Sequence, residues 1–200
     1  MADEGSSVPE LERIVKATVP VVDFFVGFAG LNAPRILQEG LIARGIRART
    51  VATDVLVGNA IFLQDKQRLG RLPRTLAECS QGAFSVGVNN DGQKVHVVSF
   101  ARGHVIDLTV KAFERPDRGI LTPLVFASRA PLHWIGGRAE EALEVELEGM
   151  LFLYRARPDL RRFEAHPDWK LDGVNQEAVE SVLASLQGAE VTSSGDPSGN

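Results

Sequence analysis

Apolar residues at helical spacing mark the first quarter of the chain. Residues 9–19 open with Pro9, which suits a first helical turn, and continue with spaced apolar side chains. Because proline removes a backbone donor from a helix, Pro20 is expected to break or kink this element. Residues 21–30 are then predicted to form a second helical piece.

The next apolar pattern predicts a helix over residues 32–44. Asn32 is placed to cap its N-terminus, and Gly45 is placed to end it. Its apolar face consists of four residues at helical spacing: Ala33, Ile36, Leu37 and Leu41.

Beyond this helix, apolar and polar residues alternate, as is typical of strands. Residues 47–57 are rich in Val and Thr and predict one strand, and residues 83–89 predict another. The NNDGQ stretch at 89–93 has the asparagine and glycine residues of a tight hairpin turn. Two further strands, KVHVVSF and HVIDLTV, are predicted to pair around residues 101–103.

The last third of the chain predicts one strand and one helix. The strand is the long LEVELEGMLFLYRARP stretch at 143–158, and the helix covers residues 175–187. Residues 1–8 and 188–200 are polar or rich in Gly, Ser and Pro, so both ends are expected to be disordered. The sum is a single α+β domain over residues 9–187, with N-terminal helices packed on an antiparallel β-meander and a C-terminal helix.

The composition is that of a globular chain with an apolar core, because 44% of the residues are apolar and 24% are charged. A formal net charge of -4 argues against a nucleic-acid groove. Charged residues interrupt the apolar stretches before they reach membrane-spanning length, and the acidic N-terminus does not resemble a secretory signal. We therefore expect a cytoplasmic protein with neither nucleic-acid nor membrane partners.

The number and spacing of the cysteine and histidine residues limit which metal sites are possible. Cys79 is the only cysteine, which excludes an internal disulfide framework and a cysteine-rich zinc site. His104, His133 and His166 are scattered without the spacing of metal ligands. Neither a metal nor a cofactor is expected.

Two titratable residues stand out because they lie inside apolar strand patterns, namely His96 and Asp107. Side chains alternate between faces along a strand, so the turn between the two strands decides whether these residues meet. A two-residue turn at Arg102 and Gly103 places both on one face in diagonal positions. A three-residue turn that includes Ala101 points Asp107 to the other face. The residues also have a purely structural interpretation, with His96 held by backbone groups and Asp107 capping the following turn.

The order of these parts resembles the transglutaminase-like branch of the papain-like fold. The resemblance covers roughly residues 28–115 and lies in a turn from a core helix into a strand, followed by a histidine strand and an aspartate strand. The matching residues are Gly45, Ile46, Ala48, His96, Asp107, Leu108 and Thr109. The resemblance implies a thiolate at the helix N-terminus, a histidine that moves its proton and a carboxylate that fixes the histidine tautomer. Such sites make and break acyl bonds on amides.

The nucleophile of that arrangement is missing from its usual place. The family's cysteine should fall between Ala29 and Ala33, where this sequence has no cysteine, serine or threonine. Cys79 precedes His96 and Asp107, so its order in the chain fits. Its context, LAECSQG, is predicted as the end of a short helix, where the helix dipole raises the pKa of a thiol.

Three functions follow from these observations and remain open. The first is a non-catalytic transglutaminase/papain-like domain that binds a protein or peptide in a remnant cleft between helix 32–44 and the meander. The second is a thiol-dependent amide hydrolase or acyl transferase that uses Cys79, His96 and Asp107. The third is an unrelated α+β interaction or immunity protein whose strand 143–158 pairs with a partner as a sheet edge.

Overall fold

The chain is described by a computed structural model that covers most of its length. The described residues are 7–25, 31–74, 78–79, 84–87, 96–137, 142–160, 162–166 and 169–193. The hairpin turn predicted at NNDGQ lies outside these residues.

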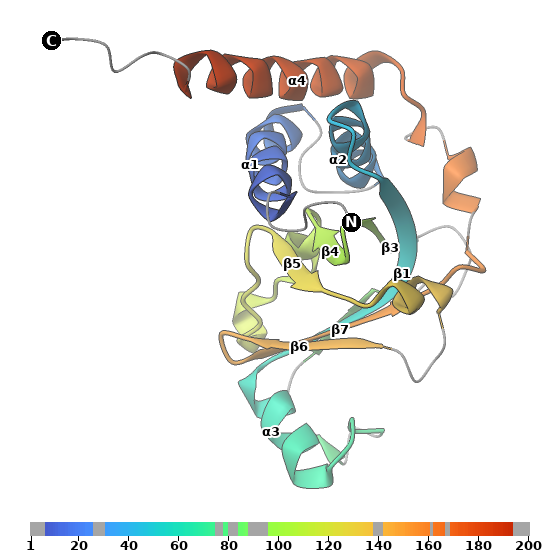
Figure 1. The fold of residues 1–200 in the computed structure, drawn as a ribbon. Helices are drawn as coiled ribbons and strands as arrows, with labels where there is room; N and C mark the ends of the chain where they lie inside the picture. Colours follow the sequence, from blue (N-terminus) through green and yellow to red (C-terminus); the bar gives the residue numbers. More distant parts are fainter. Residues whose placement is uncertain are drawn as a thin grey trace, which may run out of the picture.

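One antiparallel sheet of seven strands forms the centre of the described part of the chain (Figure 1). The strands are β1 (Ala48–Gly58), β2 (Phe84–Gly87), β3 (His96–Ala101), β4 (His104–Asp107), β5 (Phe126–Arg129), β6 (Leu143–Leu147) and β7 (Met150–Ala156). Their order is β5-β4-β3-β1-β7-β6, and β2 pairs with the end of β1. β1 is the central strand, since it pairs with β3 through its first half and with β7 through its second half.

Three helices pack together on one face of this sheet, and α4 lies across the other two (Figure 1). The helices of the described chain are α1 (Ser7–Phe25), α2 (Asn32–Ala43), α3 (Ala60–Leu69) and α4 (Gly173–Ser193). Ala101 and Ile106 carry the sheet's contribution to the core shared with α1, α2 and α4. α3 lies at the opposite end of β1. The predicted α+β class with N-terminal helices and a C-terminal helix is therefore confirmed.

The other face of the sheet carries a second apolar core rich in aromatic rings. Short 3-10 turns at Val110–Phe113 and Leu132–Gly136 cover it in place of long helices. Its aromatic members are Phe100, Phe113, Phe126, Trp134, Phe152 and Tyr154. The sheet thus separates a helical side from an aromatic side, and each strand residue belongs to one or the other.

Pro20 does not end the first helix, contrary to the sequence prediction. α1 runs without interruption from Ser7 to Phe25 with Pro20 inside it. Val21 and Val22, directly after the proline, are buried in the core shared with α2 and α4. This packing stabilises the helix beyond the proline against the cost of the missing backbone donor, so the predicted break does not occur.

The predicted ends of the second helix had mixed outcomes. Asn32 is the first helical residue and not the cap, because Leu31 precedes the helix and no side chain caps it. Leu31 is buried against the sheet, and this apolar contact takes the place of a cap. The end at Gly45 is confirmed, since its φ of 72° is left-handed and its N–H donates to the Ile42 carbonyl at 2.9 Å.

The long strand predicted at 143–158 is two strands joined by a tight turn. Glu148 and Gly149 form the turn with φ values of 51° and 76°, and β6 pairs back onto β7. Only β6 lies at the sheet edge, while β7 lies between β1 and β6. The C-terminal helix is also longer than predicted, because α4 reaches Ser193 and includes the start of the expected disordered tail.

Candidate functional site

The turn between β3 and β4 decides the relation of His96 to Asp107, and it has two residues. Arg102 and Gly103 have positive φ values of 50° and 71°, and Ala101 pairs directly with His104. Both φ values belong to the mirror-image turn that joins tightly paired strands. His96 and Asp107 therefore lie on the same face, and His96 Nε2 is 2.7 Å from Asp107 Oδ2. Of the two arrangements that the sequence leaves open, the structure has the one in which the two side chains meet.

Four hydrogen bonds hold the Asp107 carboxylate, which is completely buried. Oδ1 accepts from the backbone N–H of Thr109 at 2.8 Å and from the Thr109 hydroxyl at 2.9 Å. Oδ2 accepts from the Tyr154 hydroxyl at 2.8 Å as well as bonding His96. Burial alone would raise the pKa of Asp107, but the charge of His96 and these hydrogen bonds together lower it below the ordinary value.

Aromatic rings enclose the histidine on the aromatic side of the sheet. The ring of His96 meets Phe113 edge to face with centroids 4.8 Å apart, and its side chain is 10% exposed. Tyr154 stacks on Phe126 with centroids 4.8 Å apart. Burial, followed by the neighbouring Asp107 charge, raises the pKa of Tyr154 well above its ordinary value, so its hydroxyl remains a donor. Among the described residues, no partner lies at Nδ1 of His96.

The His96–Asp107 pair faces away from α2. Along β3, Val98 and Phe100 share the aromatic side with His96, whereas Val97 and Ala101 contact the helical side. α2 packs on that helical side, where Ser99 Oγ donates to the Pro34 carbonyl at 3.3 Å. The sheet therefore separates the pair from the helix whose N-terminus would carry the nucleophile, and a remnant cleft between them is not supported.

Cys79 is not brought to the pair either. It packs beside Phe62 and Leu63 of α3, at the far end of β1 from the helical layer. Burial, followed by the charges of Asp65 and Glu78, raises the pKa of its thiol above the ordinary value. An activated nucleophile needs the opposite shift. The helix end predicted around Cys79 falls partly on residues 75–77 and 80–83, outside the described residues.

No family model, no curated protein and no solved structure matches the chain. Two further searches concern only the described part of the chain. No helix there is long and apolar enough to cross a membrane, and no three His, Cys, Asp or Glu side chains are grouped as metal ligands would be. The function has to be inferred from the geometry alone.

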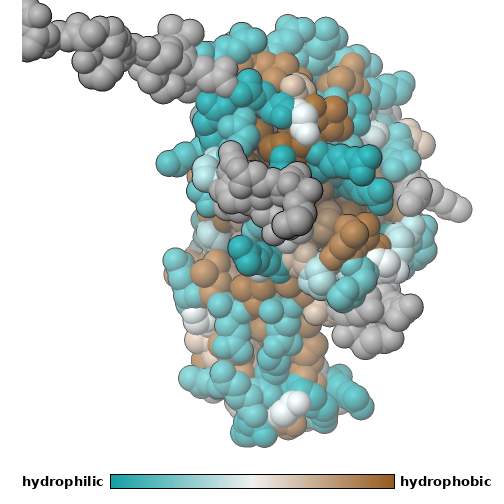
Figure 2. Space-filling model, in the orientation of Figure 1, coloured by the Kyte–Doolittle hydropathy of each residue, from teal (hydrophilic) through white to brown (hydrophobic). Residues whose placement is uncertain are grey.

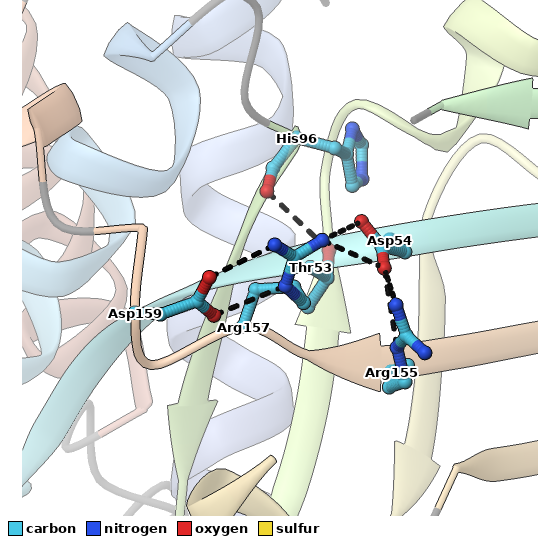
Figure 3. A network of polar contacts seen from close by, with 6 residues as sticks. All are labelled: Thr53, Asp54, His96, Arg155, Arg157 and Asp159. Atoms are coloured by element: carbon cyan, nitrogen blue, oxygen red, sulfur yellow. Dashed lines mark hydrogen bonds and ion pairs between the residues drawn. The ribbon is translucent and has the colours of Figure 1, made fainter. Parts of the chain in front are cut away.

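A charged network that the sequence analysis missed lies close to His96 but on the other side of the sheet. Asp54 of β1 accepts hydrogen bonds from Arg155 of β7 and from Arg157 at 3.0 Å, and Arg157 also bonds Asp159 at 2.8 Å. Figure 3 shows His96 joined to this region through its backbone carbonyl, which accepts from Thr53 Oγ1, with no bond drawn from its ring. Since Asp54 is 9% exposed and doubly paired, the network ties β1 to the end of β7. The one sequence signal for it is the aspartate inside the apolar VATDVLVG stretch.

A groove between α1 and the β4–β5 edge is the second feature that the sequence did not indicate. It has a volume of about 1300 Å³ and is lined mainly by apolar side chains. Apolar surface is exposed in the region of β5 in the space-filling view (Figure 2). Helical spacing predicted the inner face of α1, but the distance between α1 and a strand more than 100 residues later depends on tertiary packing.

Proposed function

We propose that this chain is a non-catalytic α+β domain that binds a protein or a peptide. The order of the motifs along the sequence resembles a transglutaminase/papain-like plan, but the sheet lies between α2 and the His96–Asp107 pair, an arrangement that does not fit the site of that plan. The observation that carries the non-catalytic assignment is the position of Cys79 in the α3 cluster, away from the contacts of His96. A cytoplasmic location and the lack of nucleic-acid partners are also part of the proposal. The acidic net charge of -4 supports the second, and the presence of only one cysteine agrees with a reducing compartment.

Covalent catalysis requires a nucleophile within hydrogen-bond reach of its base, about 2.6–3.2 Å between heavy atoms. The side chains that contact the His96 ring among the described residues are Asp107, Phe113 and Tyr154. Tyr154 is the only hydroxyl among them, and it donates to Asp107 instead of to the histidine. Among the described residues the pair therefore links β3, β4 and β7 with no nucleophile beside the histidine.

Binding is supported by apolar side chains that are exposed in the described part of the chain. Leu121 and Leu124, just before β5, are 60% and 47% exposed. Leu124 lines the α1/β5 groove, and Leu121 precedes Leu124 by three residues. Exposed apolar side chains that gather beside a groove are typical of surfaces that contact another molecule.

The catalytic part of the proposal is tested by the alkylation rate of Cys79 in the folded protein as pH is varied. We expect slow labelling at neutral pH that accelerates only above the ordinary thiol pKa of 9.0, and an unchanged profile in His96→Ala. Cys79→Ser should abolish labelling, because no other cysteine is present. Fast labelling near neutral pH that slows in His96→Ala would instead establish the thiol-dependent hydrolase or transferase.

The binding part is tested by selecting displayed random peptides on the folded chain. Recovered sequences are synthesised, labelled and measured by fluorescence anisotropy. We expect a recurring sequence pattern and dissociation constants in the micromolar range or tighter. If repeated selections return no shared pattern and no measurable affinity, the proposal of a peptide-binding domain is wrong.

A further inference from the structure

The groove between α1 and β5 combines an apolar floor with a sheet edge that no other described strand pairs with. Its apolar lining is shared between the helix and the strands, and includes Leu11, Val15 and Val19 from α1 and Ile106, Val125 and Ala127 from the sheet side. Ala127 is exposed, so the small side chain leaves space over the strand. A volume of about 1300 Å³ exceeds what a single side chain fills and is large enough for a chain segment.

The outer edge of β5 offers unpaired backbone groups beside this groove. Among the described residues, β5 pairs only with β4. The N–H of Ala130 donates to the Gly103 carbonyl at 2.8 Å, so the backbone of residue 130 faces β4. Backbone groups of an antiparallel strand alternate in direction, so Ser128 also faces β4 while Ala127 and Arg129 face outward. An edge of this kind can accept an additional strand.

The rim of the groove is cationic on a chain whose net charge is -4. Lys16 of α1 and Arg129 of β5 line it and are exposed. Arg13 and His104 also line it, although Arg13 is paired with Glu10. Glu12 is the carboxylate among the lining residues. The local excess of positive charge favours an acidic occupant.

We propose that this groove binds an extended acidic segment of another protein, which adds as a strand to the outer edge of β5. The segment carries apolar side chains at every second position, facing α1, and acidic side chains near Lys16 and Arg129. This inference rests on the proposed function and names its site and partner chemistry. Backbone hydrogen bonds to Ala127 and Arg129 set the register of the added strand, and its apolar side chains are buried in the groove.

A second copy of this chain fits the groove less well. The other edges of the described sheet are β2 and β6. β2 (FSVG) carries no carboxylate to meet Lys16 and Arg129, and Glu144 and Glu146 of β6 form ion pairs with Lys66 of the same chain. The alternate β6 residues Leu143 and Val145 pack on the aromatic core of their own chain. Neither the glutamates nor the apolar residues of β6 are therefore free to enter the groove of another copy.

The probes are two synthetic peptides of alternating residues, valine–glutamate and valine–lysine, each about eight residues long so that they exceed a four-residue strand at ~3.3 Å per residue. Binding is measured by fluorescence anisotropy at two salt concentrations. We expect the acidic peptide to bind and to weaken with salt, and the basic peptide to bind at least about tenfold more weakly. N-methylation of alternate backbone nitrogens, which removes the strand donors, should abolish binding of the acidic peptide. Unchanged binding after methylation in both registers would overturn the strand addition.

Variants of the protein locate the site. Ala127→Glu places a carboxylate in the groove and should weaken the acidic peptide more than about tenfold, while Lys16→Glu should weaken it roughly three- to tenfold and reduce its salt dependence. Lys170→Glu makes the same charge change at an exposed position that does not line the groove, and should leave affinity unchanged.

The outcomes separate this inference from the proposed function. Peptides selected on the folded chain that bind equally well to wild type and Ala127→Glu would overturn the groove assignment and leave the peptide-binding function intact. Failure of every selected and designed peptide to bind would overturn both. Concentration-dependent dimers that Ala127→Glu dissociates would show that a second copy occupies the groove, which also overturns the inference.

Discussion

Replacing Tyr154 with phenylalanine removes one hydrogen bond from the buried Asp107 carboxylate and little else. The lost bond is the 2.8 Å contact from the tyrosine hydroxyl to Oδ2, and the ring that stacks on Phe126 is retained. Asp107 keeps its bonds to His96 and Thr109. Tyr154→Phe therefore measures what a neutral donor contributes to a buried, charged acceptor.

The expected loss is large because the acceptor is charged and completely buried. Hydrogen bonds to charged groups contribute about 1.5–3 kcal/mol, against about 0.5–1.5 kcal/mol for neutral pairs. For a domain of this size each 1 kcal/mol lowers the melting temperature by about 2–4 °C. Tyr154→Phe should thus lower it by roughly 3–12 °C at neutral pH.

The loss should depend on pH with a definite sign. The pKa of Asp107 is depressed in the folded protein, so its contribution to stability is fully present above the ordinary aspartate value of 3.8 and disappears as pH falls through the folded pKa. Removing a donor raises the folded pKa. The stability gap between wild type and Tyr154→Phe should therefore be constant near neutral pH and narrow in acid.

Urea denaturation at a series of pH values checks this prediction, with Thr53→Val as the matched control. Thr53 Oγ1 donates to the neutral His96 carbonyl at 3.4 Å and is also buried, so its removal should cost less than about 1 kcal/mol at every pH. A Tyr154→Phe loss below about 0.5 kcal/mol, or a gap as independent of pH as that of the control, would refute the reasoning.

Three other outcomes are expected. Tyr154 is the only tyrosine and its pKa is raised by burial and by Asp107, so the phenolate absorbance of the chain should appear only as the protein unfolds in alkali. Gly137→Ala should lower the urea midpoint more than Gly149→Ala. Both positions have positive φ, but only at Gly137 would a Cβ lie 2.3 Å from Pro158. Equal losses would show that backbone strain alone determines the cost of each substitution. Pro20→Ala should raise the free energy of unfolding by about 2 kcal/mol at an unchanged m-value. Proline in a helix interior costs about 3 kcal/mol, and its stiffening of the unfolded chain offsets about 0.4–1 kcal/mol of that cost. An unchanged free energy of unfolding would mean that α1 tolerates the missing donor without strain.

The local sequence pattern was sufficient to predict those helices and strands whose ends depend on nearby residues. Helical spacing predicted the core residues of α2, and Gly45 predicted its end. The hairpin between β3 and β4 was predicted, but both turn lengths were compatible with Gly103, and only the positive φ of Arg102 settles which one forms. The turn at Glu148 and Gly149 was missed because a glutamate in a left-handed conformation has no strong local signal.

Which residues come together in the candidate site depends on tertiary packing, which the local sequence does not encode. His96 and Asp107 are close in sequence and their pairing was one of two arrangements that the sequence left open, whereas Tyr154 joins them from 47 residues beyond Asp107. The side of the sheet on which α2 packs could not be read from the helix, because its apolar face fits either surface of a strand pair. Asp54 and Arg155 meet across 101 residues for the same reason.

The central position of β1 has a consequence for the chain during its synthesis. One edge of β1 is satisfied by β3 after about 43 residues, but the other waits for β7, whose Arg155 lies 101 residues beyond Asp54. At about 5–20 residues per second, that edge is without its partner for roughly 5–20 s. Throughout that interval a valine-rich strand presents unpaired backbone groups, the condition under which nascent chains associate with one another or recruit chaperones. The central strand of the folded sheet, β1, is thus the strand most exposed to association with other chains until β7 has been synthesised.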